Sequence, residues 1–486
     1  MNNASKITNK GVAISLMVTS VVIVLMMIFG VIMLLNQGNV VQISPQLFYK
    51  VMTIHGTGMI GIAALGGSAI MWYYLSTYIH LNAKIFFANL LLSLIGVVFI
   101  LIAIFVFHFS DGWTFLFPLP AYSANLYGKT GALLFLFGML LLGIGYLLMY
   151  FYLAARFKKE YGGLLKSLGW DVILGKKKYG PPSSVVAATM VIITNSTAIL
   201  AGATVIVGSF INIINPAFSM DPMLAKHLTY AFGHIFANCT IYMAVIAVYE
   251  ILSNYTGRPW KTNKVFLIAW NCSTIFTLMI YTHHLLMDFA VPKWMLIIGQ
   301  VFSYANGLPV MVVTAYGALM IVYHSAIKWD FASSMMFLAM FGWVAGAVPA
   351  IIDATIVINH IMHNTKWVPG HFHTYMGMGV VAMIFGFMYY FNKTEGTQKE
   401  KSLDKLAIVT YFIFFTGLTG SFLYAGKISA PRRWAEHLPE WTASDQVGAL
   451  CGIFIIAAAL VFTIRFIVGL KKIGSNTTDK SLKSAS

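Results

Sequence analysis

The sequence has few charged residues and few cysteines, and each shortage excludes a class of protein. Only 9% of its 486 residues are Asp, Glu, Lys or Arg, while 59% are hydrophobic; an ordinary soluble domain has about 25% charged residues. A soluble domain is therefore excluded. The three cysteines lie far apart, and no CxxC or CxxCH motif is present. This excludes a disulfide framework and a covalent c-type haem, so a cysteine-based electron-entry site would have to lie on a partner.

Acidic residues are scarce as well, with 15 Asp and Glu against 31 Lys and Arg and a formal net charge of +16. A nucleic-acid-binding protein would carry this charge on a soluble, Arg-rich face. Here the basic residues lie in short segments between apolar runs, which is typical of loops on the cytoplasmic side of a membrane. We therefore expect a lipid membrane and no nucleic acid as partner.

Apolar runs of about 20 residues or more, the length that spans a bilayer, predict an all-α polytopic membrane bundle of about twelve transmembrane helices. The first run is too long for the apolar region of a signal peptide, roughly 7 to 15 residues, and is interpreted as a retained helix. The predicted helices are 11–36, 47–79, 84–108, 129–157, 185–213, 226–252, 264–287, 292–323, 331–356, 366–391, 404–427 and 447–470.

Basic residues after the even-numbered helices test this count, because a missed helix would invert every later loop. They concentrate there, as at Lys176 to Lys178 and at Lys393. The prediction is a multi-pass protein of the cell membrane with both termini in the cytoplasm. The chain 1–486 is treated as one domain, with a cytoplasmic linker at 159–184 and a polar cytoplasmic tail at 471–486. Arg432 and Arg433 are the exception on the outer side.

Six of the 13 histidines fall within predicted helices and share one depth, in the outer half of the bilayer. A single histidine there is more often a packed side chain bonded to a carbonyl, but six at one depth indicate metal sites, and imidazole suits copper and iron. The six are His55, His234, His283, His284, His371 and His373.

The spacing of these histidines divides them further. Residues two apart on an α-helix project about 200° apart, so His371 and His373 are expected to serve two different sites. His283 and His284 are adjacent and can converge on one ion if a third ligand comes from another helix. His234 is at a suitable depth for that role.

The flanks of these histidines resemble the catalytic subunit I of the haem–copper oxidases, a superfamily that includes cytochrome oxidases and nitric oxide reductases. The residues before His371, among them His363, Asn364 and Trp367, are most similar to those of the B-type branch. The resemblance is carried by Thr-Ile-His-Gly-Thr (53–57), Phe-Gly-His (232–234), Thr-His-His (282–284), Trp-Val-Pro-Gly-His-Phe-His (367–373) and Ala-Pro-Arg-Arg-Trp (430–434).

The resemblance implies two haems, of b, a or o type, and a second metal. His55 and His373 would be the axial ligands of a low-spin haem, and His371 the ligand of a high-spin haem. The second metal would be copper, as in oxidases, or non-haem iron, as is common in nitric oxide reductases. Its implied ligands are His234, His283 and His284.

The resemblance also implies further contacts and partners. Arg432 and Arg433 would bind haem propionates, since paired guanidinium donors suit carboxylates, and Asp353 would join them. The alternatives are a solvated basic pair in a loop for the two arginines and an ordinary helix-end carboxylate for Asp353. The implied partner is a smaller electron-entry subunit that carries CuA or cytochrome c, with cytochrome c or quinol as the donor.

The sequence departs from the family at one position. Many of these oxidases place a tyrosine four residues after the first copper ligand, where this chain has Asn238. An amide is redox-inert but can hydrogen-bond a substrate. We therefore expect catalytic roles for Asn238 and for a substitute tyrosine, Tyr281. A proton route from the cytoplasmic side would pass Ser273 and Thr277, with Tyr242 deeper, although Ser and Thr in such helices often bond their own backbone carbonyls.

The predicted function is that of a membrane respiratory reductase, an oxidoreductase that reduces O2 to water at the haem and copper centre. Nitric oxide reductase is the alternative, favoured locally by Asn238. A metal transporter is the remote alternative. It would need ligands near the bilayer midplane at broken helices, and the sequence shows neither.

Overall fold

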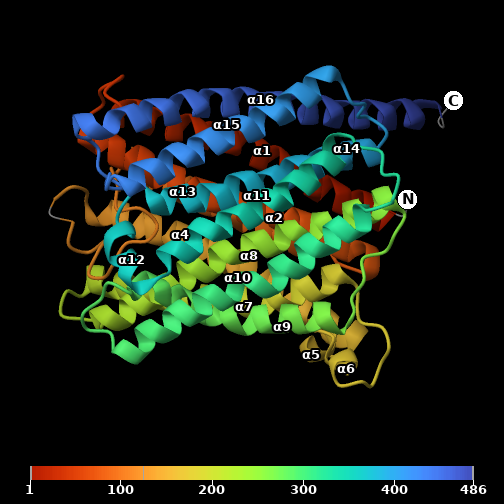
Figure 1. The fold of residues 1–486 in the computed structure, drawn as a ribbon, viewed down its shortest axis with the longest axis horizontal. Coiled ribbons are helices and arrows are strands. Elements are labelled where there is room, and N and C mark those ends of the chain that lie inside the picture. Colours follow the sequence, from red (N-terminus) through yellow and green to blue (C-terminus); the bar gives the residue numbers. More distant parts are fainter. Residues whose placement is uncertain (1–2, 124, 484–486) are drawn as a thin grey trace.

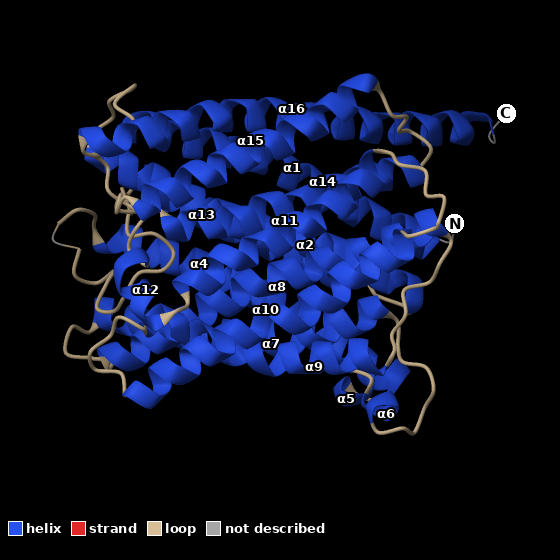
Figure 2. Cartoon of the chain, in the orientation of Figure 1, coloured by secondary structure: helices blue, strands red, loops and turns tan. Residues whose placement is uncertain are grey.

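The computed structural model describes residues 3–123 and 125–483, and helices dominate this part of the chain (Figure 2). No strand is found among these residues, only an isolated bridge between Thr365 and Pro431. Twelve of the helical segments are long and apolar enough to cross a membrane. The predicted fold class and number of spans are confirmed.

Most predicted boundaries agree with the structure to within about four residues; the first helix begins earlier than predicted and the last is longer at both ends. The spans are α1 (Asn3–Gln37), α2 (Pro45–Tyr78), α3 (Ala83–Phe105), α4 (Lys129–Tyr161), α7 (Ser183–Ile214), α8 (Pro222–Thr256), α9 (Lys264–Met279) with η1 (Ile280–Leu285), α10 (Lys293–Val322), α11 (Phe331–Asp353), α13 (Trp367–His373) with η2 (Thr374–Val381) and α14 (Ala382–Thr394), α15 (Ser402–Lys427) and α16 (Pro439–Lys483).

Three short helices lie outside the spans. Two of them, α5 (Leu164–Ser167) and α6 (Trp170–Ile173), lie within the predicted linker 159–184, and α12 (Ile356–Met362) precedes α13. In Figure 1, α5, α6 and both ends of the chain lie at one end of the bundle, and α12 lies at the other. The linker and both termini therefore share one side, as the charge pattern predicts. The side that faces the cytoplasm stays a prediction.

Two helices that carry single predicted ligands begin in the same way. Ser44 accepts a hydrogen bond from the backbone N–H of Leu47, and Pro45 is the first residue of α2. Asp221 caps α8 in the same manner, and Pro222 follows it. A capping oxygen followed by proline fixes a helix start. These starts set the depths of the histidines ten and twelve residues further on.

Glycine allows two of the outer helices to pack with their backbones in contact. A Cβ on Gly96 of α3 would lie 2.6 Å from the carbonyl oxygen of Gly138 on α4, and the reverse substitution would meet the oxygen of Gly96 at the same distance. Small residues permit such close approach between membrane helices.

We predict that Gly96→Val lowers the thermal stability of the purified protein, because the backbone it meets cannot move aside. Overpacking of this kind costs about 1–3 kcal/mol. Gly420→Ala is the matched control, since its Cβ meets nothing within 4 Å and alanine favours helix. A thermal unfolding assay in detergent should show a lower midpoint for Gly96→Val alone. Equal midpoints for both variants would contradict this account of the α3–α4 contact.

Candidate functional site

All six predicted histidines line one cavity inside the bundle. Its volume is about 480 Å³, within the range of about 300–1,000 Å³ that is typical of pockets for small ligands and cofactors. The wall is formed mainly by apolar side chains from helices at both ends of the sequence, from Met27 on α1 to Ile455 on α16. A cavity of this size and character suits large, flat, apolar groups.

His55 and His373 face each other across one part of this cavity. The Nδ1 of His55 bonds the carbonyl oxygen of Met26 at 2.6 Å, and the Nδ1 of His373 bonds that of Pro369 at 2.8 Å. A carbonyl only accepts, so each Nδ1 donates and each Nε2 keeps a free lone pair. The ring centres are 6.2 Å apart and the planes differ by 14°. One metal ion fits between them with bonds of about 2 Å.

Close packing holds this pair in place. A Cβ on Gly30 of α1 would lie 3.0 Å from the Cε1 of His55, so only glycine lets α1 approach this ring. Phe422 of α15 packs edge-on against His373, with 5.2 Å between ring centres. The pair is therefore built by α1, α2, α13 and α15 together.

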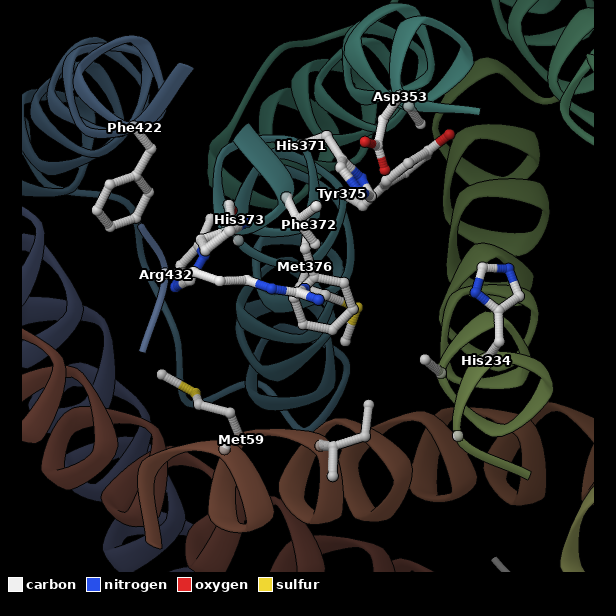
Figure 3. A pocket seen from close by; sticks show the side chains of 18 of the residues that line it. Met59, His234, Asp353, His371, Phe372, His373, Tyr375, Met376, Phe422 and Arg432 are labelled. Carbon is white, nitrogen blue, oxygen red and sulfur yellow. Dashed lines mark hydrogen bonds between the residues drawn. The ribbon is translucent and has the colours of Figure 1, made fainter. Parts of the chain in front are cut away.

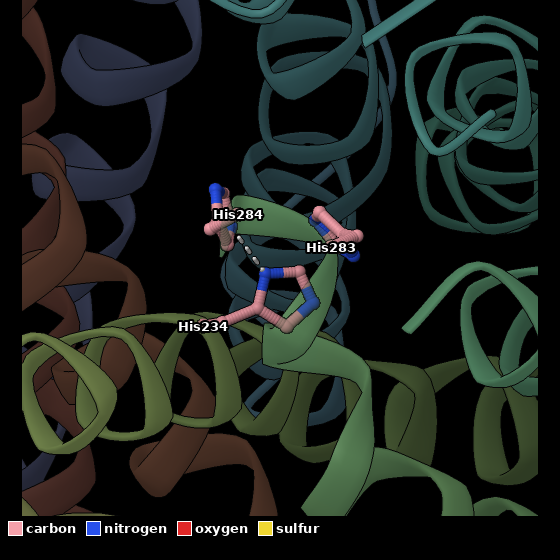
Figure 4. A group of neighbouring side chains, drawn as sticks. All are labelled: His234, His283 and His284. Atoms are coloured by element: carbon pink, nitrogen blue, oxygen red, sulfur yellow. Dashed lines mark hydrogen bonds between the residues drawn. The ribbon is translucent and has the colours of Figure 1, made fainter. Parts of the chain in front are cut away.

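The second group is a cluster of three histidines, shown in Figure 4. One ligand atom from each of His234, His283 and His284 lies within 4.8 Å of the others. His234 Nδ1 is 3.0 Å from His284 Nε2, His283 Nδ1 is 2.9 Å from the hydroxyl of Ser303, and the buried Nε2 of His234 has no partner among the described residues. Three imidazoles with nitrogens this close suit one copper or iron ion.

The backbone under two of these ligands differs from the prediction. The expected α-helix 264–287 ends at Met279, and a 3₁₀ segment continues from Ile280 to Leu285. Successive residues project about 120° apart in a 3₁₀ helix. The rings of His283 and His284 nevertheless lie close together, with 4.4 Å between their centres. His234 lies opposite them on α8, so the three side chains converge.

His371 lies between the two groups. Figure 3 shows His371 and His373 directed to different parts of the cavity, as their spacing predicts. His371 interacts electrostatically with His234, and its buried Nδ1 has no hydrogen-bond partner among the described residues. A π-helical segment begins at Thr374, directly after the ligand pair; such segments are frequent at functional sites.

A seventh histidine, His363, joins the site and was missed by the sequence reasoning. Its Nε2 is 3.4 Å from the Nδ1 of His284, and its Nδ1 is 3.1 Å from the Oδ2 of Asp353. Metal-bound imidazoles commonly have such a second partner, which fixes their orientation. Asp353 also lines the cavity, and its Oδ1 is buried without a partner in the part of the chain that the structure describes. The one available signal was the position of His363, eight residues before His371.

Arg432 and Arg433 also line the cavity, at the end of the bundle near α12 and α13. The bridge between Thr365 and Pro431 and a bond from the Arg432 N–H to the Asn364 carbonyl hold their loop against the start of α13. Neither guanidinium has an ion-pair partner in the described part of the chain. Burial and the charge of Arg433 lower the pKa of Arg432 to about 10. Two cationic groups without anions fit the carboxylates of a haem.

The structure separates the residues predicted around the substrate. Asn238 lines the cavity, and its buried Nδ2 has no partner among the described residues. Tyr281 is not among the cavity-lining residues, and its hydroxyl is 3.5 Å from Nδ1 of His227, two turns of α8 outward from His234. The predicted catalytic role of Tyr281 therefore has no contact to support it. Tyr230 does line the cavity and stacks on His284, with 4.9 Å between ring centres.

The predicted proton-route residues lie together below the three-histidine cluster. Thr277 donates a hydrogen bond to Oδ1 of Asn306 at 3.0 Å, and Ser273 lies 3.5 Å from the carbonyl of the same residue. Tyr242 interacts with both Thr277 and Asn306 and lines the cavity. Asn306, from α10, was missed because its place between α8 and α9 depends on tertiary packing.

Comparison with known proteins agrees with this geometry. A profile of the family described as "Cytochrome C and Quinol oxidase polypeptide I" matches residues 11–461. The chain belongs to this family. Members of this family are oxidoreductase subunits that typically bind haems and copper.

Individual relatives are distant. The chain is 23% identical to cytochrome c oxidase subunit 1 of Thermus thermophilus over 266 residues, which cover 50% of this chain and 47% of that protein. It is 22% identical to the protein of the same name from Synechocystis sp., over 88% of this chain and 76% of that one. The chain thus spans about half the length of the Thermus relative.

One solved structure shows the same fold. It is a haem–copper terminal oxidase dimer determined by cryo-electron microscopy, with a TM-score of 0.79 and 20% sequence identity, over 96% of this chain and 84% of that one. At this identity the likeness extends to the fold alone.

We predict that His55→Ala removes one haem per chain, because the haem between His55 and His373 then loses one of the two imidazoles that anchor it to α2 and α13. The haem-to-protein ratio of the purified variant, measured as the pyridine haemochrome, should fall from two to one. His360→Ala, at an exposed position on α12, should leave it at two. A His55→Ala protein that keeps both haems would contradict the assignment of this pair.

We also predict that His234→Ala loses one non-haem metal ion per chain, because two imidazoles remain where three converge. Elemental analysis for copper and iron, normalised to protein and haem, should show the loss. The matched control is His80→Ala, at an exposed position just past α2. Full retention of the extra metal in His234→Ala would refute the three-histidine site.

Proposed function

We propose that this chain is the catalytic subunit of a membrane nitric oxide reductase, in which two NO, two electrons and two protons give N2O and water. The observation that carries the proposal is Asn238 in the cavity wall. It lies four residues after His234 on α8, so the two side chains share one face. Oxidases similar to this chain commonly have a phenol at this position.

The amide of Asn238 suits a substrate that needs no electron from the protein. Its Nδ2 is buried without a partner among the residues that the structure describes, and an unpaired buried donor costs about 1–3 kcal/mol. A bound NO would accept this hydrogen bond and relieve that cost. Reduction of O2 to water takes four electrons and benefits from a phenol that supplies one of them, whereas coupling of two NO takes only two.

The residues of this chain would hold and supply the reaction. When bound, the high-spin haem held by His371 and the copper or iron ion held by the three-histidine cluster would bind the substrate and deliver electrons. The amide of Asn238 would orient it. Protons would reach the substrate through Tyr242, Thr277 and Asn306. Their hydroxyl and amide groups form a connected row that lies next to the three-histidine cluster, toward the end of the bundle that carries α5 and α6. The apolar wall would exclude bulk water.

Reduction of O2 to water is the second candidate. Two observations favour it: the relatives named above are cytochrome c oxidase subunits, and Tyr230 stacks on the ligand His284. A phenol in that position could donate an electron and a proton. The interaction of Tyr230 with Arg432, however, is consistent with a hydroxyl that is turned toward the arginine pair.

The proposal includes the surroundings of the chain. Electrons would come from a smaller subunit that carries CuA or cytochrome c, or from cytochrome c or quinol as donor, and enter through the haem between His55 and His373. The protein would lie in the cell membrane with both termini and the linker 159–184 in the cytoplasm. The basic residues of that linker support this orientation.

We expect the purified enzyme to produce N2O from NO under anaerobic conditions faster than it consumes O2 in air. Asn238→Leu, which removes the amide donor at similar size, should lower the NO rate about a hundredfold, within the range typical for loss of one positioned hydrogen-bond donor. Tyr230→Phe and Tyr281→Phe should leave the NO rate within about twofold. Rapid O2 consumption that Tyr230→Phe abolishes, together with negligible N2O, would replace this proposal with the second candidate.

A further inference from the structure

A buried lysine lies at the start of α13, at the wall of the cavity, and the proposed reaction as described above gives it no role. Lys366 is 3% exposed. Its ammonium forms a short ion pair with Asp445 of α16 and donates a hydrogen bond to the Oε1 of Gln37, at the end of α1, at 2.8 Å. Three helices that are far apart in the sequence therefore meet at one charge.

The carboxylate of Asp445 is shared with a second group. Its Oδ2 is 2.6 Å from Nδ1 of His437, and His437 Nε2 is 3.2 Å from the carbonyl oxygen of Pro431. Each oxygen of the Asp445 carboxylate therefore has a partner, Lys366 for Oδ1 and His437 for Oδ2. These four side chains, Lys366, Asp445, Gln37 and His437, form the lysine cluster.

The lysine cluster faces the site of the low-spin haem. Lys366 and Gln37 both line the cavity that contains His55 and His373. The ammonium is 5.5 Å from the ring centre of Phe422, and that ring packs against His373. Lys366 also interacts electrostatically with His373. An ammonium has three donors, and Asp445 and Gln37 occupy two. The third is left for a group in the cavity.

A purely structural role explains the lysine cluster less well. Removing a lysine and an aspartate from water costs several kcal/mol per ion, and neutral side chains can join helices without this cost. Burial lowers the pKa of Lys366, while Asp445 opposes the effect. A charge at this place is explained better by a ligand in the cavity. The ammonium lies at the cavity wall, and the backbone of Lys366 is bonded to the loop that carries Arg432 and Arg433.

We propose that Lys366 binds a carboxylate of the haem held by His55 and His373, and that its charge raises the reduction potential of that haem. Reduction adds one negative charge, and a nearby cation stabilises the reduced state in a low-dielectric site. Asp445 acts in the opposite direction and moderates the effect. The inference rests on the proposed two-haem function and adds a third cationic residue to the arginine pair.

The test is an anaerobic redox titration of the low-spin haem, followed by its visible absorption bands in the intact complex. At a fixed potential, Lys366→Met should raise the ratio of oxidised to reduced low-spin haem about tenfold, a shift of about 59 mV for one electron. Asp445→Asn should shift the ratio the other way. Lys366→Arg, which keeps the charge, should restore most of the wild-type value.

Opposite shifts separate an electrostatic role from a structural one. If Lys366→Met and Asp445→Asn shift the potential in the same direction, or neither shifts it, the inference is wrong. Lys226→Met is the matched control, because Lys226 forms an ion pair with Asp288 away from the cavity wall; it should leave the potential unchanged. If Lys366→Met does not fold, Asp445→Asn still decides the sign, and Lys366→Arg tests whether the charge alone is sufficient.

Failure of the proposed function gives a different result. Wild-type protein without low-spin haem bands would remove the basis of both proposals. Low-spin bands with a potential that does not respond to these variants would refute only the role of Lys366. The N2O assay is independent of the titration and tests the substrate alone.

Discussion

The rest of the structure depends on how an imidazole is kept neutral and oriented inside an apolar bundle. A charged side chain is costly in the bilayer, and an unpaired ring nitrogen is costly when buried. At His55 and His373 the fold meets both demands by giving one nitrogen a hydrogen-bond partner and leaving the other to the cavity. For His55 the partner is the carbonyl oxygen of Met26, which forces α1 close to α2 and requires glycine at position 30. A ligand thus fixes the packing of two helices.

Much of this arrangement follows from local sequence. Twelve spans follow from apolar runs, and the separation of His371 from His373 follows from helical geometry. Contacts between distant segments could not be predicted in this way. Lys366 pairs with Asp445, 79 residues away, and Asn306 reaches Thr277 from the next helix; neither pair has a local signal. Tyr281 was predicted to be the substitute catalytic tyrosine. Its hydroxyl lies 3.5 Å from the Nδ1 of His227, a contact between two helices that has no local signal either.

The cavity is asymmetric in charge. Its outer rim has Arg432, Arg433 and Lys366, whereas the part below the three-histidine cluster has neutral hydroxyl and amide groups such as Tyr242 and Asn306. Cations at the rim suit acidic groups on bound cofactors, and their charge stabilises the reduced state of a redox group nearby. Neutral donors and acceptors suit proton transfer without trapping a charge. On the proposed function, the two kinds of wall would separate the direction of electron entry from that of proton entry.

The first and last helices lie side by side and both form the wall around His55. The amide of Asn36 on α1 bonds the carbonyl of Ala435, just before α16, and Gly452 and Ile455 of α16 line the cavity together with Gly30 of α1. This wall is complete only when α16 has entered the membrane. On the proposed function, a haem between His55 and His373 would therefore be enclosed only after nearly the whole chain has been translated. Until then the bundle would stay open on the side that α16 later covers.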